Sequence, residues 1–168
     1  MAAQLKYPLQ QVLEVKERRL SDAEKLVAER KKALEFEESK LRQLEVERDK
    51  VQLHYREKLA QFRRILDEGT TTDKIQQAKV YIKLTEEKLR VEQEKVNKQK
   101  AEVETAKQNL AQAREAWKEQ QKEVDKLTKH KEEWTKQMKL ELLLIETNEH
   151  DEIGNIIHLS NQRKNQNS

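Results

Sequence analysis

The fold is decided by residues 75–117, which read IQQAKVYIKLTEEKLRVEQEKVNKQKAEVETAKQNLAQAREAW. An apolar residue recurs at every seventh position of this stretch. A repeat of this kind is typical of a helix that packs along a narrow seam against a partner helix. Working outward, the repeat extends to Ile145 and is interrupted only at Lys131. Its members are Ile75, Ile82, Leu89, Val96, Val103, Leu110, Trp117, Val124, Met138 and Ile145.

A second seven-residue repeat precedes the first along the chain and is interrupted only at Arg48. Its members are Leu13, Leu20, Val27, Leu34, Leu41, Tyr55 and Phe62. Two such segments on one chain, separated by a short break, favour a helix that folds back on its neighbour. The sequence therefore predicts an all-α protein, an antiparallel two-helix coiled-coil hairpin. On the second helix we expect secondary seam positions at Ala78, Ala106, Ala113, Leu127 and Trp134.

Turn signals set the expected boundaries. Pro8 suits a first helical turn, since it has no N–H to donate, and predicts a helix over 8–68. Gly69 can adopt the left-handed conformation that ends a helix, and Asp73 is a good N-cap. We therefore expect a loop at 69–73, a second helix at 74–149 and a coiled-coil domain over 1–149. This register would bring Trp134 near Leu9. Residues 150–168 are polar and lack the repeat, which predicts a flexible, disordered tail.

Composition narrows the functional class. Of the 168 residues, 40% are charged and 4% aromatic, and two glycines and one proline provide too few turns for a globular domain. Charges of both signs alternate to a net +3, which gives no sign of a nucleic-acid footprint. Nowhere do 18 apolar residues occur together, so no membrane insertion is expected. The absence of cysteine fits a reducing compartment. We expect a cytosolic protein that acts by contact and is not an enzyme.

Motifs for chemistry are missing from the sequence. The four histidines are not spaced to form a metal-binding helix face, and the carboxylates lie on expected solvated faces. Gly69 and Gly154 stand alone, whereas a phosphate-binding loop needs clustered glycines. The sequence therefore predicts no catalytic, cofactor-binding or metal-binding residues.

Apolar residues outside the seam are the better functional candidates. One set of such residues is expected near the loop, and a single residue lies midway along the first helix. A second set lies where the second helix is expected to extend beyond the first. The segment MKLELLLIE is apolar on all sides, which a two-helix hairpin cannot bury. The predicted partner-binding residues are Leu53, Val80, Leu84 and Val91 near the loop, Phe36 midway, and Leu140, Leu142, Leu143 and Leu144 at the far end.

The N-terminal segment YPLQQVLEVKERRLSDAEKLVAERKKALEFEESKL, residues 7–41, resembles the opening of the YscO/FliJ family, above all its chlamydial YscO-type members. The shared features are an apolar residue, then Lys16, then Arg18 or Arg19, and then Ala23-Glu24 before the first long heptad stretch. With the expected hairpin, the resemblance covers about residues 7–150. These proteins are coiled-coil stalks of type III secretion and flagellar export.

The resemblance implies a stalk that couples a hexameric secretion ATPase to the export gate, in the bacterial cytoplasm at the inner-membrane face. It implies the ATPase ring and the gate protein as partners, and secretion chaperones as further ones, with no cofactor. Alternatives are an adaptor or escort for secretion chaperones, or a structural coiled-coil dimer. We expect a monomer when free, because a short loop keeps the two helices at a high effective concentration.

Overall fold

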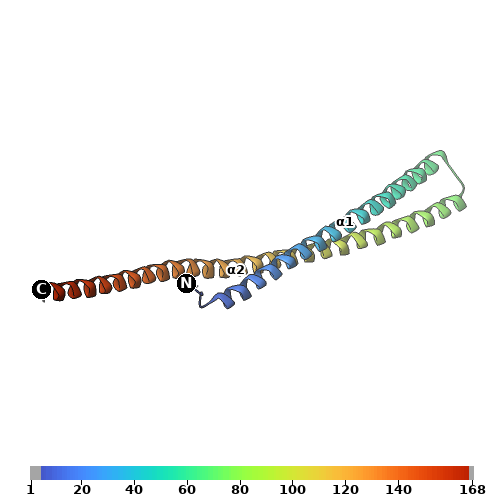
Figure 1. The fold of residues 1–168 in the computed structure, drawn as a ribbon. Helices are drawn as coiled ribbons and strands as arrows, with labels where there is room; N and C mark the ends of the chain where they lie inside the picture. The colour runs from blue at the N-terminus through green and yellow to red at the C-terminus, as the bar shows by residue number, and fades with distance from the viewer. Residues whose placement is uncertain (1–4, 167–168) are drawn as a thin grey trace. The chain divides into compact units, whose positions relative to one another are not determined.

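A computed structural model describes residues 5–166. Helix α1 spans Gln10–Glu68 and helix α2 spans Thr72–Gln166, and no strand occurs among these residues. The two helices, 59 and 95 residues long, pack against each other and are joined by a short loop (Figure 1). The predicted all-α helical hairpin is confirmed.

The loop between the helices is stabilised by backbone geometry at both ends. Gly69 follows α1 with a φ of 82°, in the left-handed region that glycine adopts without a steric cost. Thr71 is the N-cap of α2, because its carbonyl accepts the first helical hydrogen bond from the Ile75 amide at 3.2 Å. The prediction of Asp73 as N-cap is wrong, since Asp73 lies in the first turn. In the first turn, its negative carboxylate stabilises α2 by interacting with the positive end of the helix dipole.

A turn precedes α1. The amide of Gln10 donates to the carbonyl of Tyr7 at 3.1 Å, and the amide of Leu13 donates to that of Leu9 at 2.9 Å. Pro8 therefore occupies the second position of a tight turn, where its fixed φ is favourable. The helix begins at Gln10, two residues after the predicted start.

The chain forms two compact units, and each helix contributes to both. We call residues 23–117 the loop unit, and residues 1–22 with 118–168 the terminal unit. Each contains an antiparallel pair of helical segments. The two are described separately below.

The loop unit buries the predicted seam. Val96 is completely buried, and Val103, Leu110 and Ala113 are at least nine-tenths buried on the same face of α2. They recur at the seven-residue spacing and its intermediate positions, as the sequence predicts. On α1 the facing repeat is half-buried, at Val27, Leu34, Leu41, Tyr55 and Phe62. Packing along this line holds the two segments together, since a two-helix pair has no wider core.

Polar side chains interrupt the seam of the loop unit. Gln99 is 4% exposed, and its amide donates to the backbone carbonyl of Glu37 at 3.0 Å and to the Glu37 carboxylate. Thr85 is also buried, and its hydroxyl donates to the Ile82 carbonyl at 2.8 Å. Hydrogen bonding removes most of the cost of burying such groups. The cross-helix Gln99–Glu37 pair also favours one register, because shifting the helices would leave both groups unpaired.

The terminal unit is closed by an aromatic cluster. Tyr7 is 5% exposed, and its ring packs edge-on against Trp134 with 5.6 Å between centroids. The Tyr7 hydroxyl lies 2.6 Å from Nδ1 of His130. At the first residue of α1, the side-chain oxygen of Gln10 accepts a hydrogen bond of 2.8 Å from the ammonium of Lys131 on α2. The residue against Trp134 is thus Tyr7, two positions before the predicted Leu9, which is 39% exposed.

Helix α2 continues far past the N-terminal end of α1 (Figure 1). The predicted helix end at residue 149 is wrong, because residues 150–166 are helical. They contain no proline, and a lone Gly154 costs only about 1 kcal/mol, which does not stop a helix already nucleated. Every residue of 139–166 is exposed. The prediction that residues 150–168 are flexible in solution stays a prediction, and its last two residues lie outside those described.

An ion pair across the helices of the terminal unit makes its stability depend on pH. The Lys16 ammonium lies 3.5 Å from the Glu123 carboxylate, and Lys126 is equally close. The positive charge of Lys126 and the hydrogen bond from Lys16 hold the pKa of Glu123 below its ordinary value of 4.5. A lowered pKa stabilises the folded state above the ordinary value, and this contribution is lost as pH falls through the lowered one.

We therefore expect the melting temperature of the protein to exceed that of the Glu123→Gln variant at neutral pH. The difference should shrink as the pH drops below about 4.5. Thermal melts followed by circular dichroism at several pH values measure it. The effect should be small, since exposed ion pairs contribute little. A difference that stays constant down to about pH 3 would contradict this assignment.

Candidate partner-binding surfaces

An apolar stripe runs along α2 in the loop unit, on the face turned away from α1. Val80 and Leu84 are 59% and 57% exposed, and Val91 is 39% exposed. At 100° per residue, all three lie within about 20° of the direction opposite to the seam residue Ile82. The side chains of Val80, Tyr81 and Leu84 line a shallow apolar groove with Gln76 and Gln77. We call Val80, Leu84 and Val91 the outer stripe.

Leu53 lies at the same end of the hairpin but on α1, and it is 59% exposed. It too points away from the seam, so it does not join the outer stripe in one flat patch. Between them, on one flank, Nε2 of His54 lies 3.0 Å from the Tyr81 hydroxyl. The ammonium of Lys58 lies 5.5 Å from the centre of the Tyr81 ring. Tyr81 is 44% exposed and was missed by sequence reasoning, although its position next to Val80 could have indicated it.

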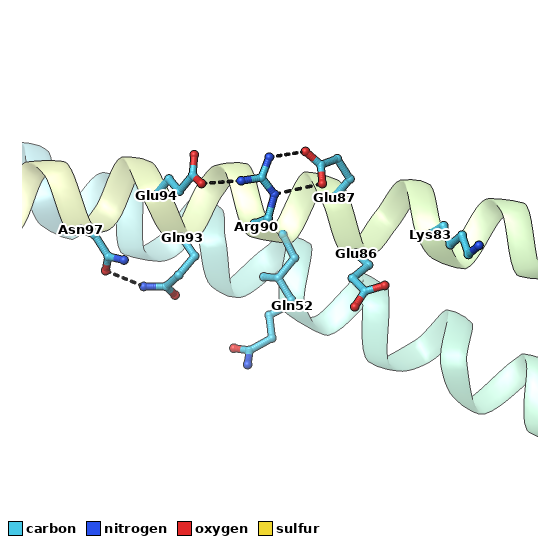
Figure 2. A pocket seen from close by; sticks show the side chains of 9 residues that line it. Gln52, Lys83, Glu86, Glu87, Arg90, Gln93, Glu94 and Asn97 are labelled. Atoms are coloured by element: carbon cyan, nitrogen blue, oxygen red, sulfur yellow. Dashed lines mark hydrogen bonds and ion pairs between the residues drawn. The ribbon is translucent and has the colours of Figure 1, made fainter.

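Charged residues border the outer stripe along its other flank. Figure 2 shows Arg90 between Glu87 and Glu94, with a hydrogen bond or ion pair to each. The hydrogen bond from Arg90 lowers the pKa of Glu87, and the carboxylates raise the pKa of Arg90. These side chains line a second shallow depression with Gln52, Lys83 and Gln93. Arg90 thus partly neutralises the carboxylates next to the stripe, which favours contact with an apolar partner.

Phe36 is 65% exposed on the outer face of α1 in the loop unit. It lies 17 residues from Leu53, about 25 Å along an α-helix, so the structure does not bring these two candidates together. It is an isolated apolar side chain.

The terminal unit carries the largest exposed apolar segment. Leu140, Leu143 and Leu144 are about three-fifths exposed, and Leu142 is 37% exposed. They point in all directions around α2, and no part of α1 covers them. The apolar residues that follow were not among the predicted partner-binding residues, because the sequence placed them in a disordered tail. These are Ile153, Ile156, Ile157 and Leu159, each at least 54% exposed.

No chemistry beyond contact is visible in the described residues. Within residues 5–166, no group of three His, Cys, Asp or Glu side chains comes together as a metal site would require. Neither described helix has a stretch long and apolar enough to cross a membrane.

The comparisons with known proteins agree with these features. The family model of YscO-like proteins matches residues 4–164, which is nearly the whole chain. The chain belongs to the YscO-like family. The resemblance seen in residues 7–41 is thereby confirmed. This YscO-like protein is a type III secretion-related protein, and its family is not a known enzyme family.

Two solved structures similar to this YscO-like protein come from chlamydiae. The structure of CT670 from Chlamydia trachomatis, a candidate YscO homolog, has a TM-score of 0.90 and 43% identity. That match covers 96% of this chain and 99% of CT670. A chain in the structure of the Chlamydia pneumoniae CdsV and CdsO protein complex is 50% identical, over 50% of this chain and 98% of that one, with a TM-score of 0.48. No curated protein matches the chain.

Proposed function

We propose that this YscO-like protein is a non-enzymatic stalk that couples the secretion ATPase ring to the export gate. The observation that carries the proposal is that each of the two units has exposed apolar residues of its own. One set lies in the loop unit, and the other lies where α2 outruns α1 in the terminal unit. A protein that couples two machines needs a distinct binding surface for each. Family membership supplies the secretion context.

In this proposal the segment with Leu140, Leu142, Leu143 and Leu144 meets the ATPase ring. A single helix, apolar on all sides, is buried best when a partner surrounds it, as the lumen of a ring does. The outer stripe, with Leu53, meets the export gate. Phe36 belongs to neither set, which makes it the candidate contact for a secretion chaperone. The site of action would be the cytoplasmic face of the inner membrane.

The test is a double variant at the terminal segment. We expect Leu142→Asp with Leu144→Asp to abolish binding to, and stimulation of, the cognate secretion ATPase. Each leucine buried by a partner contributes about 1.5–3 kcal/mol, so losing two and adding two charges should weaken binding at least a hundredfold. The measurements are ATP hydrolysis with increasing stalk protein, and co-sedimentation with the ring.

The matched control is Leu26→Asp with Val46→Asp, which changes two exposed α1 residues of the loop unit. It should stimulate the ATPase as the unchanged protein does, and both variants should keep their helix content. If the terminal variant still stimulates the ATPase, the site is wrongly placed. If the unchanged protein binds secretion chaperones but neither binds nor stimulates the ATPase, the adaptor function is correct instead.

A further inference from the structure

The seam face of α2 does not end where α1 stops covering it. In the terminal unit the half-buried seam residues Val124, Leu127, Lys131, Trp134 and Met138 are spaced three or four residues apart. The same spacing continues through Leu142, Ile145, Glu149, Ile153 and Ile156. All five are exposed. We call these five residues the open seam.

The open seam has the geometry of an interface between helices. Its residues lie within about 40° of one direction around α2, and they extend the line of the half-buried residues Trp134 and Met138. Leu142, Ile145, Ile153 and Ile156 are 37–66% exposed, so most of their surface is still available to a partner. Because the face is continuous with an interface already formed by a helix, the occupant that fits it is another helix.

Charge indicates what kind of helix fits. Residues 140–162 contain five acidic residues, Glu141, Glu146, Glu149, Asp151 and Glu152, and neither lysine nor arginine. The rest of the chain interleaves both signs. Where α1 covers α2, a basic side chain of α1 forms an ion pair with a carboxylate beside the seam, as Lys16 does with Glu123. A helix on the open seam should do the same for Glu149, which lies in the middle of the face.

A second copy of the chain fits this face poorly. Two open seams packed together would bring two segments of five acids and no Lys or Arg into contact, and like charges at an interface oppose association. We propose that the open seam binds a basic amphipathic helix of a partner protein. The inference deepens the proposed function, since it names the chemistry of the partner at the segment placed in the ring.

The probes are three fluorescein-labelled peptides of about 21 residues, long enough for three heptads. The first carries leucine at the seam positions and lysine at the flanking ones. The second has the same leucines with glutamate, and the third is the first with its order scrambled. Fluorescence anisotropy measures their binding to the full chain. We expect the basic peptide alone to bind, and to bind more weakly when salt is raised from about 50 to about 300 mM.

Two matched variants locate the binding. Leu142→Asp with Ile156→Asp should weaken binding of the basic peptide at least tenfold, since both residues belong to the open seam. Thr147→Asp with His158→Asp adds the same charge on the opposite face of the same helix, where both side chains are exposed and neither is among the leucines proposed to meet the ATPase ring. This control should change the affinity less than about twofold. The Glu149→Lys variant should shift the preference toward the acidic peptide.

Several results would overturn the proposal. Equal binding of the scrambled peptide would mean simple charge attraction, and equal losses in both double variants would mean that no face is selected. A dimer in light scattering that the Leu142→Asp, Ile156→Asp variant dissolves would make a second copy the occupant. The ATPase assay separates the two ideas. Stimulation without peptide binding refutes only this inference, and peptide binding without stimulation refutes only the stalk function.

Discussion

Replacing Val96 by aspartate is expected to unfold the loop unit. Val96 is completely buried at the seam of the loop unit. An isolated carboxylate there would be both desolvated and without a partner, and such substitutions belong to the most destabilising class. We expect the free energy of unfolding to fall by more than about 4 kcal/mol. A pair of helices with so few buried residues cannot absorb that loss.

The matched control is Val91→Asp, which makes the same change five residues earlier on the same helix. Val91 is 39% exposed and belongs to the outer stripe, so its aspartate stays in water. We expect a change within about 0.5 kcal/mol. Circular dichroism melts and amide hydrogen exchange across residues 23–117 measure both variants. Equal melting temperatures would show that the seam does not hold this unit together.

The seam was predictable because a seven-residue repeat has one physical meaning. Only packing along a narrow line selects apolar residues at Val96, Val103 and Leu110 and charged residues between them. The secondary positions Ala78, Ala106, Ala113, Leu127 and Trp134 are likewise buried or half-buried. Gly69 marked the loop for a related reason, since a left-handed residue is needed where α1 ends. Both the packing pattern and the turn could therefore be predicted, because each depends on the residue types at nearby positions.

Other features left no such signal. Gln99 is buried at a seam position because it finds an acceptor in Glu37 that only the register of α1 against α2 provides. Thr85 is buried because its hydroxyl bonds the carbonyl of Ile82 in its own helix, which the seven-residue repeat does not report. The extent of α2 was missed because the repeat reports packing, whereas a helix persists wherever nothing breaks it. Because α2 was predicted to end at residue 149, the part of the open seam beyond that residue was not predicted. In a disordered tail Ile153 and Ile156 would share no face, but on a helix they continue the face of Leu142.

The exposed candidates illustrate what a sequence can and cannot give. Phe36, Leu53, Val80 and the leucines of 140–144 fall outside the repeat, and each is exposed in the structure. Their grouping was not evident. Leu53 and Val80 lie on the outer faces of different helices, with the His54–Tyr81 pair on the flank between them. Which of these residues can contact the same partner depends on whether they lie on one face of the hairpin. That in turn depends on the register of α1 against α2.

The second large effect is expected at Tyr7, which fastens the N-terminal end of α1 to α2. Its ring covers Trp134, its hydroxyl meets His130, and it is 5% exposed. We expect Tyr7→Ala to destabilise the terminal unit by about 3–5 kcal/mol, as loss of a buried aromatic ring does. Tyr7→Phe keeps the ring and should cost about 1 kcal/mol, the contribution of one hydrogen bond.

The measurement uses Trp134 fluorescence in a Trp117→Phe background, together with amide exchange of residues 10–22. In Tyr7→Ala the emission of Trp134 should move to longer wavelength, because the indole becomes exposed to water, and residues 10–22 should exchange faster. In Tyr7→Phe both should stay close to those of the parent protein. Loosening α1 here would also lengthen the open seam toward Trp134. Tyr7→Ala should therefore bind the basic peptide at least as tightly as the parent does, and weaker binding would mean that α1 itself forms part of that site.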